Sequence, residues 1–333
     1  MRGRWLVTGG CGFIGTAVLA RLLRDGATGI RIVDDLSVGT REDLASVAAF
    51  REVGSDEISG GPEGVELVVA DVRDAEAAVA AARGIDAIVH LAANTGVQPS
   101  IEDPRLDCTT NVLGTLNYLE AARGEGVRRF VFASSGGTVI GDAEPPIHEE
   151  MVPHPKSPYG ASKSACEGYL SAYHGSFGID GVALRFGNVY GPGSGHKGSV
   201  VARFVRRALA GEPLEIFGDG DQTRDFIYID DLVDAVVRAA TVDGIGGEVF
   251  QIATARETSV NELAQKMLPL LRAEVSPDVR IVTAGALPGE IRRNYSDTSK
   301  ARERLGWAAS TPLDDGLRRT IRSLAAGASR PVD

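Results

Sequence analysis

Short apolar runs alternate with stretches of helical periodicity through the first 185 residues of the chain. Residues 4–8 predict a buried strand, and the apolar spacing after the glycines that follow predicts a helix. Further strands are predicted at 30–33, 68–70, 88–90 and 130–133. Strands that alternate with helices are typical of a parallel, doubly wound sheet. We therefore expect residues 1–185 to form an α/β domain of the Rossmann type.

The pattern becomes less regular in the rest of the chain. Helices are predicted near 199–210, 230–240 and 259–272, with irregular connections between them. We expect residues 186–333 to form a smaller α/β domain, with some of its chain crossing back to the first domain.

Composition and charge exclude several classes of protein. The chain has 333 residues, which is enough for both domains, and a net charge of −10. That charge argues against a nucleic-acid partner, whose phosphates need a basic face. No apolar run reaches membrane-spanning length, so we expect no membrane partner. Three cysteines suit a reducing cytoplasm, and the five histidines have no metal-binding spacing. We expect a cytoplasmic protein without a metal site.

A glycine-rich turn joins the first strand to the first helix, which is the context of the dinucleotide-binding fingerprint. Its glycines let the backbone approach a pyrophosphate at the helix N-terminus. The second strand ends in two aspartates, about 20 residues after the turn. An acidic side chain there accepts from both ribose hydroxyls and repels a 2′-phosphate, which favours NAD over NADP. The predicted cofactor contacts in this region are Gly9, Gly12, Phe13, Ile14, Gly15, Asp34 and Asp35.

Tyr159 and Lys163 are four residues apart, so they project from one face of a helix. A free phenol has a pKa of about 10 and is a poor base at neutral pH. A neighbouring ammonium, together with the positive nicotinamide ring, favours the phenolate. The pair therefore predicts acid–base chemistry beside a nicotinamide cofactor, with both residues also contacting that cofactor.

Glycine turn, acidic strand end and Tyr159-x-x-x-Lys163 together resemble the extended short-chain dehydrogenase/reductase family, specifically its nucleotide-sugar epimerases and dehydratases. Segments 184–192, 224–232 and 305–307 match further hallmarks in the family's order. The resemblance implies more cofactor contacts, at Asp71, Val72, Leu91, Ala92, Ala93, Asn111 and Phe186.

The same resemblance makes the second domain a substrate domain for a nucleotide diphosphate sugar, with a UDP-sugar favoured. The net charge is negative, so local arginines must hold the anionic substrate. The implied substrate-binding residues are Thr95, Ser135, Gly136, Thr138, Asn188, Ser199, Val200, Phe217, Arg224 and Arg292.

The family places a hydroxyl donor, which binds the reacting oxygen, just after the strand at 130–133. Counting from that strand gives Ser135, whereas counting back from Val139-x-Gly141 gives Gly136, which has no side-chain donor. The mismatch looks like a one-residue insertion. We favour Ser135 as the third catalytic residue, because a strand end fixes geometry and a loop absorbs insertions. Thr138 is the alternative donor.

This segment also separates the family's reactions. The 4,6-dehydratases typically carry Thr-Asp-Glu here, and sugar-acid decarboxylases usually keep a glutamate, whereas this chain has Gly136, Gly137 and Thr138. The resemblance therefore points to a 4-epimerase, which oxidises C4 transiently and returns the hydride to either face. A dehydratase or uronic-acid decarboxylase that uses another acid is the first alternative. A catalytically idle NAD-binding sensor is a distant one.

The family resemblance also implies a homodimer. Helices near 103–123 and 158–176 are expected to pair with their copies in a second subunit as a four-helix bundle. Leu113, Leu116 and Leu119 lie at helical spacing and supply apolar positions for this contact. The same spacing also fits a helix that faces the core of one subunit.

Overall fold

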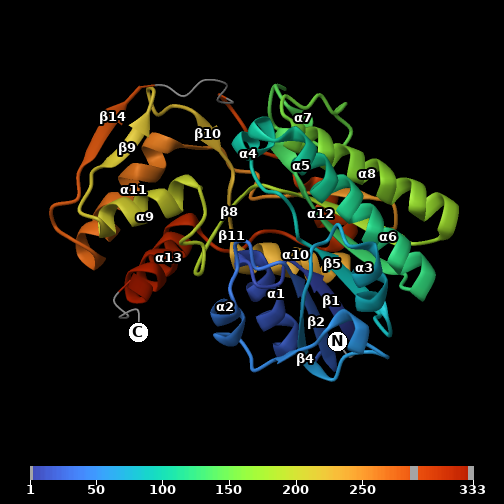
Figure 1. Cartoon of the computed structure of the whole chain (residues 1–333). Coiled ribbons are helices and arrows are strands. Elements are labelled where there is room, and N and C mark those ends of the chain that lie inside the picture. Colours follow the sequence, from blue (N-terminus) through green and yellow to red (C-terminus); the bar gives the residue numbers. More distant parts are fainter. Residues whose placement is uncertain (1–2, 286–291, 329–333) are drawn as a thin grey trace.

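The computed structural model describes residues 3–285 and 292–328. An eight-stranded parallel sheet forms its centre (Figure 1), in the order β3-β4-β2-β1-β5-β6-β7-β12. The strands are β1 (Arg4–Thr8), β2 (Gly29–Asp34), β3 (Arg51–Glu52), β4 (Gly64–Val69), β5 (Ala87–His90), β6 (Arg129–Ser135), β7 (Asp180–Phe186) and β12 (Val249–Ile252). The predicted Rossmann-type α/β fold is confirmed.

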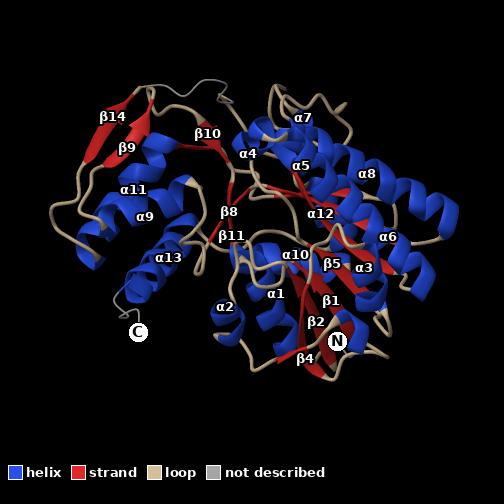
Figure 2. Cartoon of the chain, viewed as in Figure 1, coloured by secondary structure: helices blue, strands red, loops and turns tan. Residues whose placement is uncertain are grey.

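Both faces of the sheet are covered by helices (Figure 2). Successive strand residues point to opposite faces, so β1 sends Leu6 to one core and Val7 to the other. Val7 packs in the core beneath α1 (Phe13–Arg24) and α10 (Ile229–Ala239). Leu6 packs in the core beneath α3 (Ala75–Ala82), α6 (Gly114–Glu125) and α8 (Pro158–Phe177). Because β1 is buried on both faces, its sequence is a continuous apolar run rather than an alternation of apolar and polar residues.

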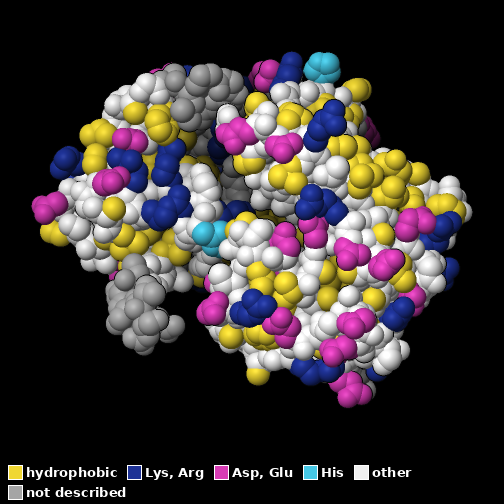
Figure 3. Space-filling view, viewed as in Figure 1, with side chains coloured by type: hydrophobic (Ala, Val, Ile, Leu, Met, Phe, Trp, Pro, Cys, Tyr) yellow, Lys and Arg dark blue, Asp and Glu magenta, His cyan; other side chains and the backbone are white. Residues whose placement is uncertain are grey.

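The smaller lobe is built from three short strand pairs and the helices around them (Figure 1). Its strands are β8 (Asn188–Tyr190), β9 (Leu214–Phe217), β10 (Thr223–Arg224), β11 (Phe226–Tyr228), β13 (Thr258–Ser259) and β14 (Ile281–Ala284). Its helices are α9 (Val200–Leu209), α11 (Val260–Glu274) and α13 (Leu313–Ala328). Basic side chains gather over this lobe in Figure 3, whereas acidic ones spread over the larger lobe.

Elements that follow β8 in sequence also belong to the larger lobe. Strand β12 pairs with β7 at the edge of the main sheet, and α10 packs against α1. Short elements complete the chain: α2 (Arg41–Ala45), η1 (Ser55–Glu57), α4 (Val97–Glu102), α5 (Pro104–Cys108), the π-turn η2 (Thr109–Leu113), α7 (Gly136–Ile140) and α12 (Ser299–Leu305). None of the helices in the described part of the chain is both long and apolar enough to span a membrane.

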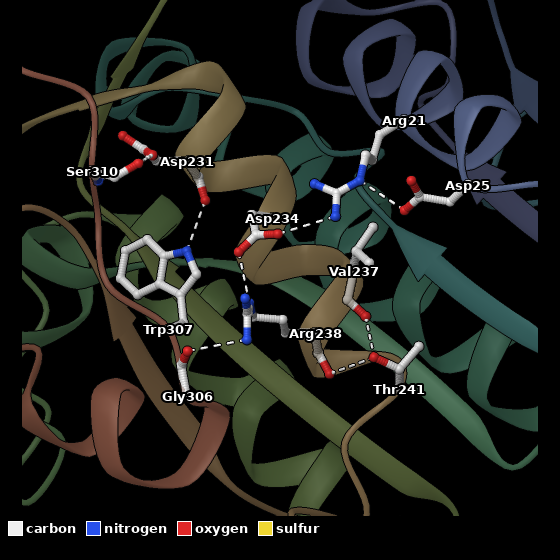
Figure 4. A network of polar contacts seen from close by, with 10 residues as sticks. All are labelled: Arg21, Asp25, Asp231, Asp234, Val237, Arg238, Thr241, Gly306, Trp307 and Ser310. Carbon is white, nitrogen blue, oxygen red and sulfur yellow. Dashed lines mark hydrogen bonds and ion pairs between the residues drawn. The ribbon is translucent and has the colours of Figure 1, made fainter. Parts of the chain in front are cut away.

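A polar network fixes α10 between α1 and the C-terminal segment (Figure 4). Asp234 accepts from Arg21 of α1 at 3.1 Å and from Arg238 at 2.6 Å. The buried indole of Trp307 donates to the Asp231 carbonyl at 2.9 Å. The hallmark segment 305–307 thus has a structural role. It holds α10, the helix that packs against α1 and so supports the glycine turn.

Candidate active site

The glycine turn leaves one open side at the start of α1. Gly9 has a φ of +67°, and a Cβ there would lie 2.8 Å from the Ala92 nitrogen. A Cβ at Gly15 would lie 2.3 Å from the Gly9 carbonyl oxygen, so helix and strand approach too closely for a side chain. A Cβ at Gly12 would meet only that oxygen, at 3.4 Å. Gly12 is thus the open position, and the first N–H groups of α1, at Phe13 and Ile14, fit a pyrophosphate.

Asp34, the last residue of β2, and Asp35, which follows it, have different surroundings. Asp34 is buried, and it accepts hydrogen bonds from the backbone nitrogens of Cys11 and Leu36, each at 2.9 Å. Burial raises the pKa of Asp34. Asp35 is exposed and accepts from the nitrogen and hydroxyl of Ser37. Each oxygen of Asp34 still has a lone pair for a ribose hydroxyl, so Asp34 is the better placed of the two.

Asp34→Ala is expected to weaken NAD binding by at least about 10-fold, since charge-assisted hydrogen bonds contribute about 1.5–3 kcal/mol each. It should also reduce the discrimination against NADP, because the charge that repels a 2′-phosphate is lost. Calorimetric titration with both dinucleotides measures this, with Asp35→Ala as the neighbouring control. A wild-type preference for NADP would refute the assignment.

The other predicted cofactor contacts follow the carboxyl ends of the parallel strands β1, β4, β5 and β7. Leu91, Ala92 and Ala93 follow β5, and the Ala92 nitrogen donates to the Thr8 hydroxyl at 3.2 Å. Asp71 and Val72 follow β4; Arg73 donates to Asp71 and lowers its pKa, and Val72 packs on Gly114. Phe186 ends β7 and pairs with Ser135 of β6. These residues therefore lie together along the carboxyl-terminal side of the sheet.

Asn111 lies in the π-turn that interrupts the predicted helix 103–123. Its amide oxygen accepts from the Asn94 nitrogen at 2.8 Å, and its amide nitrogen donates to Asp107 at 2.8 Å and to Ser162 at 3.2 Å. The side chain is buried. Asn111 therefore joins the loop after β5 to α8, and its contact with the cofactor stays a prediction. Thr95 lies exposed in that loop.

Helix α8, called the catalytic helix here because it carries the predicted pair Tyr159 and Lys163, begins immediately before Tyr159. Ser157 caps it by accepting from the Gly160 nitrogen at 3.2 Å, and Pro158 occupies the first turn. A Cβ at Gly160 would lie 2.0 Å from the Thr138 carbonyl oxygen. This close contact holds the start of α8 against α7, and so brings Tyr159 beside the segment that follows β6.

Tyr159 and Lys163 share one face of α8 as predicted from their spacing. The Lys163 ammonium donates to the Ala133 carbonyl at 2.8 Å and lies 5.6 Å from the centre of the Tyr159 ring. Burial lowers the pKa of Lys163 to about 8. Burial, and then the Asp107 carboxylate, raise the pKa of Tyr159. In the protein alone, desolvation thus outweighs the effect expected from the lysine.

Ser135 is the last residue of β6, and α7 begins at Gly136. The strand therefore extends to the residue reached by counting from 130–133. Ser135 is half-buried and no protein partner of its hydroxyl is found in the described part of the chain. Thr138 lies on α7, and its hydroxyl is buried without a partner among the described residues. Both candidate donors are close to the catalytic helix, and the choice between them stays a prediction.

The two glycines after Ser135 pack against the second half of the chain. A Cβ at Gly136 would lie 2.6 Å from the Gln251 amide oxygen, and one at Gly137 would lie 2.1 Å from the Asn294 amide nitrogen. Nearby, the Ile147 nitrogen donates to the Tyr295 carbonyl at 2.9 Å. A longer side chain at position 136 or 137 would have to displace the amide end of Gln251 or of Asn294.

A buried ion pair behind the catalytic pair was not predicted from the sequence. Arg185 of β7 donates to both carboxylate oxygens of Glu167, at 2.9 and 2.7 Å, and the Ser134 hydroxyl donates to the same carboxylate at 2.6 Å. Glu167 is four residues after Lys163, so the helical spacing was the available signal. The pair joins the catalytic helix to the two strands that end at Ser135 and Phe186.

The predicted substrate residues of the smaller lobe form a second group. Asn188 of β8 pairs with Phe226 of β11, and Phe226 is two residues after Arg224. The Thr223 nitrogen donates to the Arg292 carbonyl at 2.9 Å. The Arg292 guanidinium is 60 % exposed and pairs with Asp219, and its contact with the substrate stays a prediction. Ser199 precedes Val200 at the start of α9, and its hydroxyl is buried without a partner among the described residues.

Phe217 ends β9 in the same group. The guanidinium of Arg203, which was not predicted, lies 4.6 Å over its ring. The segment 294–296 links this group to Gly136 and Gly137. In the described residues, no group of three or more His, Cys, Asp and Glu side chains could hold a metal ion.

Comparisons with known proteins place the chain among nucleotide-sugar enzymes. It is 40 % identical over 322 residues to a UDP-glucose 4-epimerase of Mycolicibacterium smegmatis, covering 96 % of this chain and 97 % of that protein. A crystal structure of Thermus thermophilus UDP-glucose 4-epimerase in complex with NAD matches with a TM-score of 0.83 and 33 % identity, covering 97 % of this chain and 99 % of that one. A dTDP-glucose 4,6-dehydratase of Xanthomonas campestris is 31 % identical and covers 95 % of this chain and 92 % of that protein.

The family description adds the cofactor. Residues 5–253 match the model of the NAD dependent epimerase/dehydratase family. The cofactor prediction is confirmed as NAD, and the open glycine turn with Asp34 beside it fits that group. With its doubly wound sheet and its Tyr159–Lys163 pair, this chain belongs to the NAD dependent epimerase/dehydratase family.

Proposed function

We propose that the protein is an NAD-dependent nucleotide-sugar 4-epimerase, with a UDP-sugar as its favoured substrate. The residues at positions 136 and 137 carry the choice of reaction. Both are glycines and supply no carboxylate for water elimination, and the amides of Gln251 and Asn294 lie against them, whereas Tyr159 and Lys163 supply the groups for oxidation at one carbon. The identity of 40 % to a UDP-glucose 4-epimerase supports the same choice.

Tyr159, Ser135 and Lys163 have separate roles in the proposed oxidation at C4. Tyr159 accepts the proton of the sugar 4-hydroxyl and later returns it. Ser135 donates a hydrogen bond to the oxygen at C4 as negative charge develops there. Lys163 holds a positive charge beside the phenolate. Bound NAD would supply the acceptor for the C4 hydride and the source of its return, and a cationic nicotinamide ring that favours the phenolate of Tyr159.

Epimerisation requires the sugar to present both faces to one catalytic group. Asn188, Ser199 and Arg224 would anchor the nucleotide diphosphate in the smaller lobe, with the guanidinium of Arg224 suited to phosphate oxygens. Arg292 would contribute only after leaving Asp219. Anchoring at the nucleotide end leaves the hexose free to turn about its phosphate linkage.

Two carboxylates in this region are already engaged by the protein, which weakens the dehydratase and decarboxylase alternatives. Glu149 accepts from the Gln251 nitrogen at 2.7 Å, and Glu167 is paired with Arg185. Asp107 accepts from Asn111 through one oxygen, and its other oxygen is buried without a partner among the described residues. An idle NAD-binding sensor would not need Tyr159, Lys163 and Ser135 side by side. These observations support a reaction confined to C4.

Incubation with uridine and thymidine diphosphate sugars, followed by chromatographic separation of the products, tests the proposal. The expected product is a sugar nucleotide that differs from the substrate only at C4, formed without net consumption of NAD. Release of carbon dioxide or accumulation of a 4-keto-6-deoxy sugar would establish one of the alternatives instead.

We also propose that the protein is a homodimer. Leu119 is fully buried in the core of the single chain, whereas Leu113 is 49 % exposed. Several other apolar side chains on α4, α5 and α8 are also exposed: Ile101, Leu106, Tyr169 and Phe177. Apolar positions gathered on neighbouring helices suit a contact with a second copy. Light scattering should give twice the chain mass at micromolar concentration, and a monomer mass would contradict the dimer.

A further inference from the structure

Lys197 differs from the other lysines of the chain in having no oxygen partner among the described residues. The sequence contains five lysines. Four of them contact a carboxylate or a carbonyl oxygen: Lys156 with Asp142, Lys163 with Ala133, Lys266 with Asp314 and Lys300 with Glu248. The Lys197 ammonium instead lies 5.2 Å over the ring of Phe13. In a protein of net charge −10, a half-buried cation without a counter-charge suggests a missing anion.

The loop that carries Lys197 connects β8 to α9 and reaches α1 in the larger lobe (Figure 1). It is held by the protein at several points. The Ser194 hydroxyl is buried and donates to the Gly191 carbonyl at 2.7 Å, and the Lys197 nitrogen donates to the Ser194 carbonyl at 2.9 Å. Arg206 of α9 donates to the Lys197 carbonyl at 2.6 Å. The position of Lys197 over Phe13 is therefore fixed by the fold of this loop.

Phe13 is the first residue of α1 and follows Gly12, the open position of the glycine turn. The positive end of this helix has no side-chain cap at Gly12 and no acidic residue in its first turn. The Lys197 ammonium lies over the side chain of the first residue of this helix, and burial lowers the pKa of that ammonium. A desolvated cation over the first residue of a helix adds to the positive end of the helix in favouring an anion there.

We propose that Lys197 is a diphosphate-binding residue that neutralises the pyrophosphate of the dinucleotide at the start of α1. Its ammonium would move from the face of the Phe13 ring to a phosphate oxygen, as a point charge without directional demands. The sugar nucleotide carries the same chemical group, but Phe13 and Gly12 place the lysine at the cofactor. The inference depends on NAD binding and is independent of the sugar reaction.

Lys300 provides a matched control within the same chain. Its ammonium lies 5.0 Å over the ring of Phe250, much as Lys197 lies over Phe13, but it is paired with Glu248 at 2.7 Å. Removing either lysine therefore removes a cation from an aromatic face. Only Lys197 is expected to affect a bound anion.

Calorimetric titration of the cofactor-free full chain with NAD, ADP and adenosine tests the proposal. Lys197→Met should weaken binding of NAD and ADP by about 10- to 100-fold, the loss expected for one charge-assisted contact. Adenosine, which has no phosphate, should bind as to the wild type. Lys197→Arg should keep most of the affinity, and Lys300→Met should bind NAD normally.

Titration with UDP in the presence of saturating NAD separates the two diphosphates. The UDP affinity of Lys197→Met is expected to match that of the wild type. If UDP binding alone weakened, the assignment to the cofactor would be overturned. Unchanged affinity for NAD in Lys197→Met would overturn it as well, as would equal losses in Lys197→Met and Lys300→Met.

Discussion

Tyr159→Phe is expected to bind NAD normally and to lose about 10²- to 10⁴-fold in turnover. The substitution removes the proton acceptor of the 4-hydroxyl and little volume, so the packing of α8 should be kept. Turnover with a UDP-sugar and the NAD content of the purified protein are the two measurements. A variant with near wild-type turnover would remove Tyr159 from the chemistry.

Tyr169 gives the matched control for this substitution. It lies on the same helix but is 41 % exposed, so Tyr169→Phe should leave both turnover and cofactor binding unchanged. Equal losses in the two variants would mean that the helix had been disturbed rather than the catalytic group removed.

Ser135→Ala is expected to cost roughly 10²- to 10³-fold in turnover, the loss measured when a preorganised donor to a developing oxyanion is removed. Ser135 ends β6 and faces no partner among the described residues, so its hydroxyl is available to the substrate. Thr138→Ala should cost much less. Steady-state kinetics of the two variants with the same sugar nucleotide give the ranking, and the reverse ranking would assign the donor role to Thr138.

The electrostatics of Tyr159 explain why the cofactor is expected to assist its activation. Burial and the Asp107 carboxylate both raise the pKa of the phenol, and Lys163 is itself desolvated. Because opposite charge favours the charged form, the cationic nicotinamide ring of bound NAD would add to the effect of the Lys163 ammonium and lower the pKa of the phenol. Acid–base reactivity of Tyr159 is therefore expected to increase when NAD is bound.

Local patterns were sufficient to predict the features that depend on residues near in sequence. The strand at 4–8, the glycine turn, Asp34 and the shared face of Tyr159 and Lys163 all follow from spacing and residue type, and the structure has them as predicted. The strand count to Ser135 is of the same kind, since β6 runs without interruption to that residue.

Features that depend on contacts between distant segments were not predictable in this way. Glu167 meets Arg185 only because α8 packs on β7, and Gly137 meets Asn294 only because the C-terminal half returns to the site. The apolar spacing of helix 103–123 could not separate Leu119, which serves the core, from the exposed Leu113. Lys197 gave no local signal, because its position over Phe13 depends on how a loop of the smaller lobe reaches α1 of the larger lobe.

Transfer of an isotope from C4 tests the central claim most directly. A UDP-hexose carrying deuterium at C4 is incubated with the enzyme, and the product is analysed by mass spectrometry and NMR. The account predicts that deuterium stays at C4 while the configuration there is inverted, because the hydrogen that leaves is the one that returns. Deuterium found at another carbon, or lost to water, would contradict epimerisation by transient oxidation at C4.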